Sequence, residues 1–196
     1  MLCGLHNRRR KTPWLALVCQ AALAISLSGA VPDDSLRPEY QLEANFLAMS
    51  PSFVEWPVEA GKSSTSAFLL CVYGDFHFGT SLAEMTRTTS GHGRRVEVKW
   101  TRKEADLPTC NLVFVSRSEQ KHYDHVLHTL RGTPTLTIGE TPDFLQAGGV
   151  IGLEVQEKKL QFDVNLEAAE KAHLKISARL LALARRVTGS AQAARS

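Results

Sequence analysis

The sequence predicts a single α/β domain: a mostly parallel central β-sheet flanked by helices on both faces, with an antiparallel hairpin at one edge. The first observation is a pair of unbroken apolar runs, at residues 67–73 and 110–116. Each is too short for an independent helix and suits a strand buried on both faces, which is typical of the centre of a parallel sheet. The second observation is that segments with helical spacing separate the strands. The third is a pair of strand-like segments joined by a two-residue turn near the carboxyl end.

The composition is that of one ordinary globular domain. The chain has 196 residues, of which 43% are hydrophobic and 22% are charged, and this balance excludes a disordered, collagen-like or coiled-coil protein. Four of the 23 lysines and arginines lie together at residues 8–11, so 19 remain elsewhere, against 20 aspartates and glutamates. No basic surface is implied, and nucleic acid is not an expected partner.

The first 30 residues have the pattern of a Sec-type signal peptide. A cationic stretch at 8–11 precedes an apolar stretch at 14–27, and small residues at 28–30 form a cleavage site. The apolar stretch is shorter than the ~20 residues that span a bilayer, so a membrane anchor is the less favoured alternative. We expect an exported, soluble protein that begins with a loose polar leader at 31–39.

Hydrophobic spacing and breakers predict the elements of the amino-terminal half. Apolar positions at 40–49 share roughly one helical face, and Pro51 ends that helix. A Gly-Asp turn follows the central strand and precedes a second helix at 76–88. The other elements of this half are an aromatic turn at 52–57, a polar loop at 58–66 and an alternating strand toward one sheet edge at 94–101.

The carboxyl-terminal half continues the alternation of helices and strands. After the strand at 110–116, Ser118 is a suitable cap for a helix at 118–130, and a glycine follows its end. The apolar spacing of 180–187 predicts a final helix at 177–187. The remaining elements are a strand at 133–139, a one-turn helix at 141–148, a hairpin of 149–156 with 159–165, a helix at 166–173 and a tail at 188–196 that we expect to be disordered.

Two of the four cysteines lie within the predicted domain, Cys71 and Cys110. Two cysteines in an oxidising compartment most often pair, and in the commonest doubly wound strand order their strands are neighbours. A disulfide between them is therefore expected. Two free buried thiols are the alternative.

One loop has the position of a ligand site, because it follows the central strand and opens a helix. Its candidate residues are Gly74, Asp75, Phe78 and Gly79. The glycine spacing matches neither a phosphate loop nor a dinucleotide fingerprint, so a structural turn with an aromatic plug is the favoured alternative.

No motif of the chain makes a case for catalysis. His122, His125 and His128 recur every third residue on one predicted helix, which suits a solvated face better than a metal site. No nucleophile elbow or zinc motif is present. We expect no enzyme activity, no metal and no cofactor.

Several motifs in a fixed order resemble the YfiR-like family of small exported bacterial proteins over residues 40–187. The motifs are FVEWP at 53–57, CVYGD at 71–75, FG at 78–79, Cys110, GGVI at 148–151, LQFDVNL at 160–166, AA at 168–169, LKIS at 174–177, LL at 180–181 and LA at 183–184. Cys71 and Cys110 fall at cysteine positions of that family.

The resemblance implies a periplasmic regulator that binds the periplasmic sensor domain of an inner-membrane diguanylate cyclase and represses it. Repression lowers cyclic di-GMP and biofilm formation. The resemblance also implies a homodimer, contact with the membrane only through the partner, and redox control through disulfides. We expect the partner surface on the hairpin and the last helices, with Phe162, Leu174 and Ile176 as candidates that are equally suited to the core. The alternative function is a periplasmic small-ligand-binding module that uses the crevice beyond Cys71 and Ser116.

Overall fold

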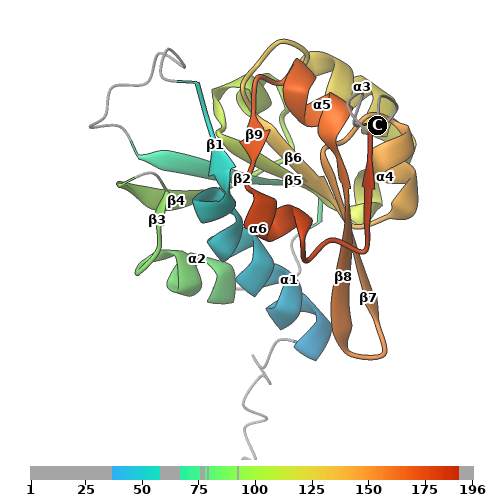
Figure 1. Ribbon diagram of the computed structural model, residues 1–196. Helices are drawn as coiled ribbons and strands as arrows, with labels where there is room; N and C mark the ends of the chain where they lie inside the picture. The colour runs from blue at the N-terminus through green and yellow to red at the C-terminus, as the bar shows by residue number, and fades with distance from the viewer. Residues whose placement is uncertain (1–36, 58–66, 76–77, 79, 92, 190–196) are drawn as a thin grey trace, which may run out of the picture. The chain divides into compact units, whose positions relative to one another are not determined.

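The computed structural model describes residues 37–57, 67–75, 78, 80–91 and 93–189. The predicted signal peptide, most of the leader, the loop at 58–66 and positions 190–196 lie outside these residues. The helices, shown in Figure 1, are α1 (Pro38–Met49), α2 (Ser81–Thr86), α3 (Tyr123–Thr129), α4 (Pro142–Gln146), α5 (Leu166–Lys171) and α6 (Ala178–Leu181). Three 3-10 turns are η1 (Ser50–Phe53), η2 (Glu104–Thr109) and η3 (Arg117–His122).

An eight-stranded sheet has the order β10-β8-β7-β6-β5-β2-β4-β3. Its strands are β2 (Phe68–Tyr73), β3 (Ser90–Gly91), β4 (Arg94–Thr101), β5 (Leu112–Val115), β6 (Leu136–Gly139), β7 (Ile151–Gln156), β8 (Lys159–Asn165) and β10 (Arg186–Thr188). From β4 to β7 every neighbouring pair is parallel, whereas β7–β8 and β3–β4 are antiparallel. The predicted mostly parallel sheet with a hairpin toward one edge is confirmed.

The central strand β2 separates two apolar layers because successive side chains of a strand point to opposite faces. Leu70 and Val72 face the layer that α1, α2 and α6 cover, and Cys71 and Tyr73 face the layer that η2, α3 and α4 cover. Five of its six residues are buried, which is why the segment reads as an unbroken apolar run.

The hairpin turn is made by two residues with left-handed backbone. Glu157 has φ 49° and Lys158 has φ 61°, and Gln156 pairs with Lys159 across them. Two consecutive positive φ values match the right-handed twist of the flanking strands. The predicted hairpin with its two-residue turn is confirmed.

Two predicted helices are shorter than expected. The helix predicted at 76–88 begins at Ser81, and Phe78 lies in the core before it. The helix predicted at 118–130 is α3 preceded by the 3-10 turn η3, and the cap is Ser116 rather than Ser118, because the Ser116 side chain accepts a hydrogen bond from the Ser118 amide.

The predicted helix at 177–187 is wrong over its second half. Only Ala178–Leu181 is helical, and the chain then extends into β10 beside β8. The Arg185 amide donates to the Phe162 carbonyl oxygen at 2.9 Å, so the segment satisfies its main chain on the sheet edge instead of within a helix.

A two-stranded ladder was not predicted. Val54–Glu55 (β1) lies in the expected aromatic turn and pairs antiparallel with Lys175–Ile176 (β9). This ladder joins the end of α1 and η1 to the start of α6, two parts of the chain that are far apart in sequence.

Candidate functional site

The disulfide joins Cys71, on β2, to Cys110, just before β5, with 6.0 Å between the two Cα atoms. The strands are neighbours, with Cys71 opposite Val113. Both cysteines are buried, at 0% and 1% exposure. The disulfide that redox compartment and topology predicted is present. The two cysteines are 39 residues apart in sequence, and the bond closes a loop that contains α2, β3, β4 and η2.

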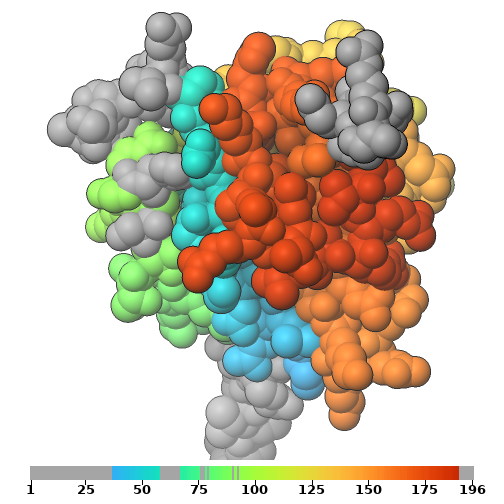
Figure 2. Space-filling model, viewed as in Figure 1, coloured from blue at the N-terminus to red at the C-terminus, as the bar shows by residue number. Residues whose placement is uncertain are grey.

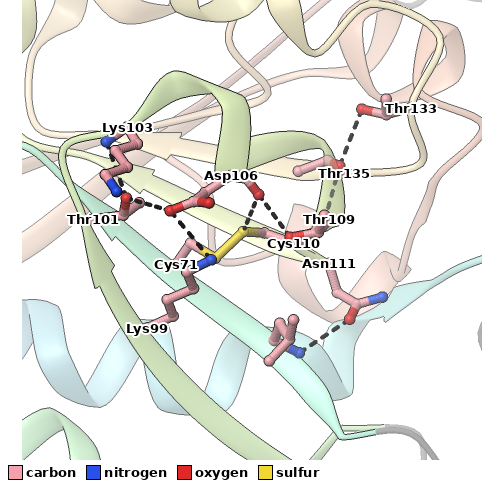
Figure 3. The surroundings of a disulfide bond; sticks show 11 residues. Cys71, Lys99, Thr101, Lys103, Asp106, Thr109, Cys110, Asn111, Thr133 and Thr135 are labelled. Carbon is pink, nitrogen blue, oxygen red and sulfur yellow. Dashed lines mark hydrogen bonds and ion pairs between the residues drawn. A yellow bond between two sulfur atoms is a disulfide. The ribbon is translucent and has the colours of Figure 1, made fainter.

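Polar contacts hold the segment around the disulfide, as Figure 3 shows. Asp106 of η2 accepts a hydrogen bond from the Thr101 hydroxyl at 2.8 Å and contacts the Lys99 ammonium at 3.2 Å. These partners lower the pKa of Asp106. The Asn111 side chain accepts from the Leu69 amide at 3.0 Å, which ties β5 to β2. These contacts fix η2 and the start of β5 around the two buried cysteines.

The loop predicted as a ligand site is occupied by the protein's own groups. The Asp75 amide donates to the Ser118 hydroxyl at 3.0 Å, and its carboxylate pairs with Arg102 at 2.7 Å. Gly74 has φ +101°, and a Cβ there would lie 2.6 Å from Ser118 Oγ. The glycine is therefore needed for close packing of two loops.

The aromatic residue of this loop belongs to the core. Phe78 is 1% exposed and packs edge-on against Tyr40 and Phe114. The structure thus favours the aromatic plug over a ligand-binding role for Phe78. Gly79 lies outside the described residues.

A pair of buried carboxyl groups was missed by the sequence analysis. Glu43 of α1 and Glu140, which follows β6, are each 6% exposed. Within the described structure Glu43 Oε2 has no hydrogen-bond partner, whereas Glu140 accepts from the Arg117 amide. Burial, then the charge and hydrogen bond of Glu140, raise the pKa of Glu43 to about 8. The sequence does contain an indication that Glu43 is buried, because Glu43 lies one turn before Leu47 on the apolar face of α1.

A cavity of about 900 Å³ lies at the amino-terminal edge of the parallel strands, among the ends of α3 and α4 and the start of α5. Its lining includes buried leucines and the threonines Thr135 and Thr137 of the β6 segment, and its exposed charged residues are of both signs, Arg131 and Lys171 together with Asp124 and Glu167. Neither Cys71 nor Ser116 lines it. The crevice expected for the small-ligand alternative is therefore not this cavity. The cavity lies at the amino-terminal ends of the parallel strands, whereas Ser116 follows the carboxyl end of β5.

Two of the three histidines in the segment of η3 and α3 lie beside carboxylates. His125 Nε2 lies 3.0 Å from Glu104, and His122 Nδ1 lies 3.3 Å from Glu119. Among the residues that the structure describes, no group of three or more histidine, cysteine, aspartate or glutamate side chains has the arrangement of a metal site.

A family model described as YfiR/HmsC-like matches residues 40–185, well over half of the chain. The chain belongs to the YfiR/HmsC-like family. At the level of the family, this membership supports a periplasmic regulator of diguanylate cyclase.

Two solved structures were also matched. One is a conserved domain protein from Vibrio cholerae O1 biovar El Tor, with 13% identity, a TM-score of 0.46, and coverage of 63% of this chain and 55% of that chain. The other is the ABC domain from Streptococcus pneumoniae in complex with L-Trp, with 10% identity, a TM-score of 0.49, and coverage of 77% and 60%. The chain therefore spans 55 to 60% of the length of these two proteins.

No helix in the described ranges of this YfiR/HmsC-like protein has both the length and the apolar character required to traverse a bilayer.

Two of the three candidate partner residues of this YfiR/HmsC-like chain lie in its core. Phe162 is 7% exposed and Leu174 is 3% exposed, and both belong to the layer under α1. Phe162 packs against Phe46 with the rings tilted by 50° and their centroids 5.0 Å apart. Phe162 and Leu174 therefore lie in the core, the alternative that the sequence suited equally, and leave little surface for a partner. Ile176 is half-buried in β9, opposite Val54.

The exposed apolar side chains lie instead at the end of α1 and after α6. Leu183 is 70% exposed, Met49 is 56% exposed and Val187 is 38% exposed. We call residues 178–188, which comprise α6, the following connection and β10, the C-terminal strap. The strap is red and covers much of the face shown in Figure 2, beside the blue atoms of α1.

The side chain of one arginine adds bonds between the strap and the hairpin to the main-chain pairing of β10 with β8. Arg185 forms two bonds of 2.9 Å with the Asp163 carboxylate and one of 2.6 Å with Glu154. The guanidinium lowers the pKa of both carboxyl groups, and they in turn raise the pKa of Arg185. Leu183 is thus held outward between α6, which Ser177 caps, and the Arg185 anchor.

Proposed function

We propose that this protein binds the periplasmic sensor domain of a membrane-bound diguanylate cyclase and holds the cyclase inactive. The observation that carries the proposal is the match of residues 40–185 to the YfiR/HmsC-like family. A protein that performs no chemistry represses an enzyme by binding its inactive state more tightly than its active state. The shift in the equilibrium equals that difference in affinity.

The C-terminal strap is the surface we assign to the partner. Leu183 supplies an exposed apolar centre, and the arginines at 179 and 186 are exposed on either side of it in sequence. An apolar centre with a charged rim is the usual anatomy of a protein interface. The complementary surface on the sensor domain is therefore expected to be apolar with an acidic rim.

The test is binding of the purified protein to the periplasmic domain of the diguanylate cyclase encoded nearest to it. Leu183→Asp should weaken binding by at least tenfold, because it places a charge at the centre of the interface. The free energy of unfolding should change by less than about 0.5 kcal/mol, because the side chain is exposed. Gln146→Asp, on the opposite side of the sheet, is the matched control.

Unchanged binding of Leu183→Asp would remove the strap from the proposal, and no binding by the unmodified protein would remove the proposal itself. Cyclase activity measured with and without the regulator distinguishes repression from binding alone.

The redox-gated form of the proposal requires that a reductant reach the sulfur atoms of two cysteines that are 0% and 1% exposed. The same binding assay with and without reductant tests it. Binding that weakens on reduction supports gating, whereas unchanged binding makes the disulfide a structural bond only.

A second candidate function is the binding of a small ligand, which the cavity of about 900 Å³ favours. Its lining combines apolar side chains with acidic and basic groups, which suits a small organic molecule that carries a charged group. A thermal-shift screen with charged organic molecules and their neutral amides tests it, and equal shifts from both would contradict it.

A further inference from the structure

The outer edge of β4 is largely unpaired. On one side β4 pairs with β2 from Val96 to Thr101. On the other side β3 pairs only with Arg94 and Arg95. In the portion of the chain that the structure describes, no strand covers residues 96–101 on that side. Alternate amide and carbonyl groups of this stretch therefore face outward, which is a template for another strand.

The side chains along this edge divide between the two faces of the sheet. Val96, Val98 and Trp100 pack against the apolar layer that includes α2. Glu97 and Lys99 point to the other face, where their side chains are 45% and 40% exposed. The charges along this face alternate in sign from Arg95 through Glu97 to Lys99.

Alternating charges make the edge complementary to itself in one register. Two copies of β4 that pair antiparallel are related by a twofold axis normal to the sheet. Residues that oppose each other across the axis must point to the same face of the sheet. The axis therefore lies at a residue that opposes its own copy, and each choice of that residue defines one register. An axis at Glu97 opposes two glutamates, and an axis at Lys99 opposes two lysines. An axis at Val98 opposes Glu97 to Lys99 twice, and on the other face opposes Val96 to Trp100 twice.

Of the two remaining registers, one is blocked by β3 and the other forms no ion pair. An axis at Val96 would need Arg94 and Arg95, whose outer edge β3 already occupies. An axis at Trp100 opposes Lys99 to Thr101 and forms no ion pair. The register centred on Val98 is thus the one that matches both charge and available main chain.

We propose that β4 is an interaction surface for a second copy of this chain, with the two β4 strands paired antiparallel about Val98 to give one continuous sheet across the dimer. The occupant is a second copy because the charge pattern complements itself. The ion pairs that Glu97 and Lys99 form with Arg95 and Asp106 within one chain are partly exposed, and such pairs contribute little. They therefore do not prevent the new pairs. The proposal does not depend on binding to a cyclase.

The first test is the oligomeric state by sedimentation over a wide range of protein concentration. The unmodified protein should form a dimer, and Glu97→Lys or Lys99→Glu should each raise the dimer dissociation constant by about tenfold or more, because each substitution acts at two symmetric pairs. The double variant Glu97→Lys with Lys99→Glu should restore dimerisation. Glu170→Lys, an exposed charge reversal on α5, is the control.

A monomer at all concentrations overturns the proposal. So does a dimer that the single variants leave unchanged, or a double variant that is as weak as the single ones.

The second test uses a thiol at the symmetry axis and needs no charge reversal. Val98→Cys should give a covalent dimer with a short bismaleimide, since opposed Cβ atoms of paired strands lie about 5 Å apart. Leu183→Cys and Gln146→Cys should not. Cross-linking through Leu183→Cys but not through Val98→Cys would instead place the dimer contact on the C-terminal strap.

Discussion

Glu43 is the residue whose environment departs most from its usual one. A carboxyl group on the buried face of a helix loses hydration, and here it faces a second carboxyl group, Glu140, as well as Glu39 one turn earlier. Arg117 partly offsets the repulsion. The protein therefore retains a proton at Glu43 that the unfolded chain would release.

Glu43→Gln should make stability less dependent on pH. The pKa of Glu43 is about 8 in the folded protein and 4.5 in its ordinary state, so the folded state binds the extra proton between these values and the free energy of unfolding falls as pH rises through them. At pH 7 the cost is about 3 kcal/mol at most. The glutamine variant should match the unmodified protein near pH 4 and exceed its stability at pH 8.

Urea unfolding at pH 4, 6 and 8 measures this difference. A constant offset between the two proteins would show that Glu43 is not the titrating group. Glu84→Gln, an exposed position on α2, is the control.

The strand β10 is held both by its pairing with β8 and by the side chain of the residue that precedes it. It pairs with β8 over three residues, and its preceding residue, Arg185, holds Asp163 and Glu154. Asp163 is 8% exposed, so the loss of the guanidinium would leave a carboxylate nearly without solvent.

Arg185→Met should lower the free energy of unfolding by roughly 1–2 kcal/mol at pH 7, a value reduced because the arginine side chain is a third exposed. Arg185 lowers the pKa of Asp163, so this stabilisation is present above the ordinary pKa of the carboxyl group, 3.8, and is lost as pH falls through the lowered value. The difference from the unmodified protein should shrink as the pH falls below 3.8.

Denaturant unfolding at pH 7 and at pH 2 to 3 checks the expectation, with Arg179→Met as an exposed control. Hydrogen exchange should also be faster in β10 of the Arg185 variant. Equal stability of the two proteins at pH 7 would mean that the strap is held by its main-chain bonds alone.

At the scale of the whole molecule the disulfide is the main covalent constraint among the described residues. It joins two central strands across 39 residues and is buried. Replacement of both cysteines, Cys71→Ala with Cys110→Ala, should cost about 4 kcal/mol, because the unfolded chain gains the entropy of an open loop. Thermal unfolding with and without reductant measures this, and a loss below about 1 kcal/mol would contradict the entropic account.

Much of the sheet could be predicted because the relevant signals are local. The apolar run that contains Cys71 is long enough for a strand and too short for a helix, and the two residues at 157–158 have the length of a hairpin turn. The disulfide followed from compartment and strand order. The candidate partner surface was predicted less well, because Phe162 has the same apolar character whether it faces solvent or Phe46.

The sequence by itself determined the α/β class, the parallel centre, the hairpin and the pairing of Cys71 with Cys110. Each depends on periodicity, on turn chemistry or on a topology that few arrangements satisfy. Only the folded chain showed that residues 186–188 form a strand, that Val54 pairs with Ile176, and that Glu43 meets Glu140. In each case the partner group is distant in the sequence, so no local pattern identifies it. For the two strand segments, the free energy gained by pairing also exceeds the local preference of the segment.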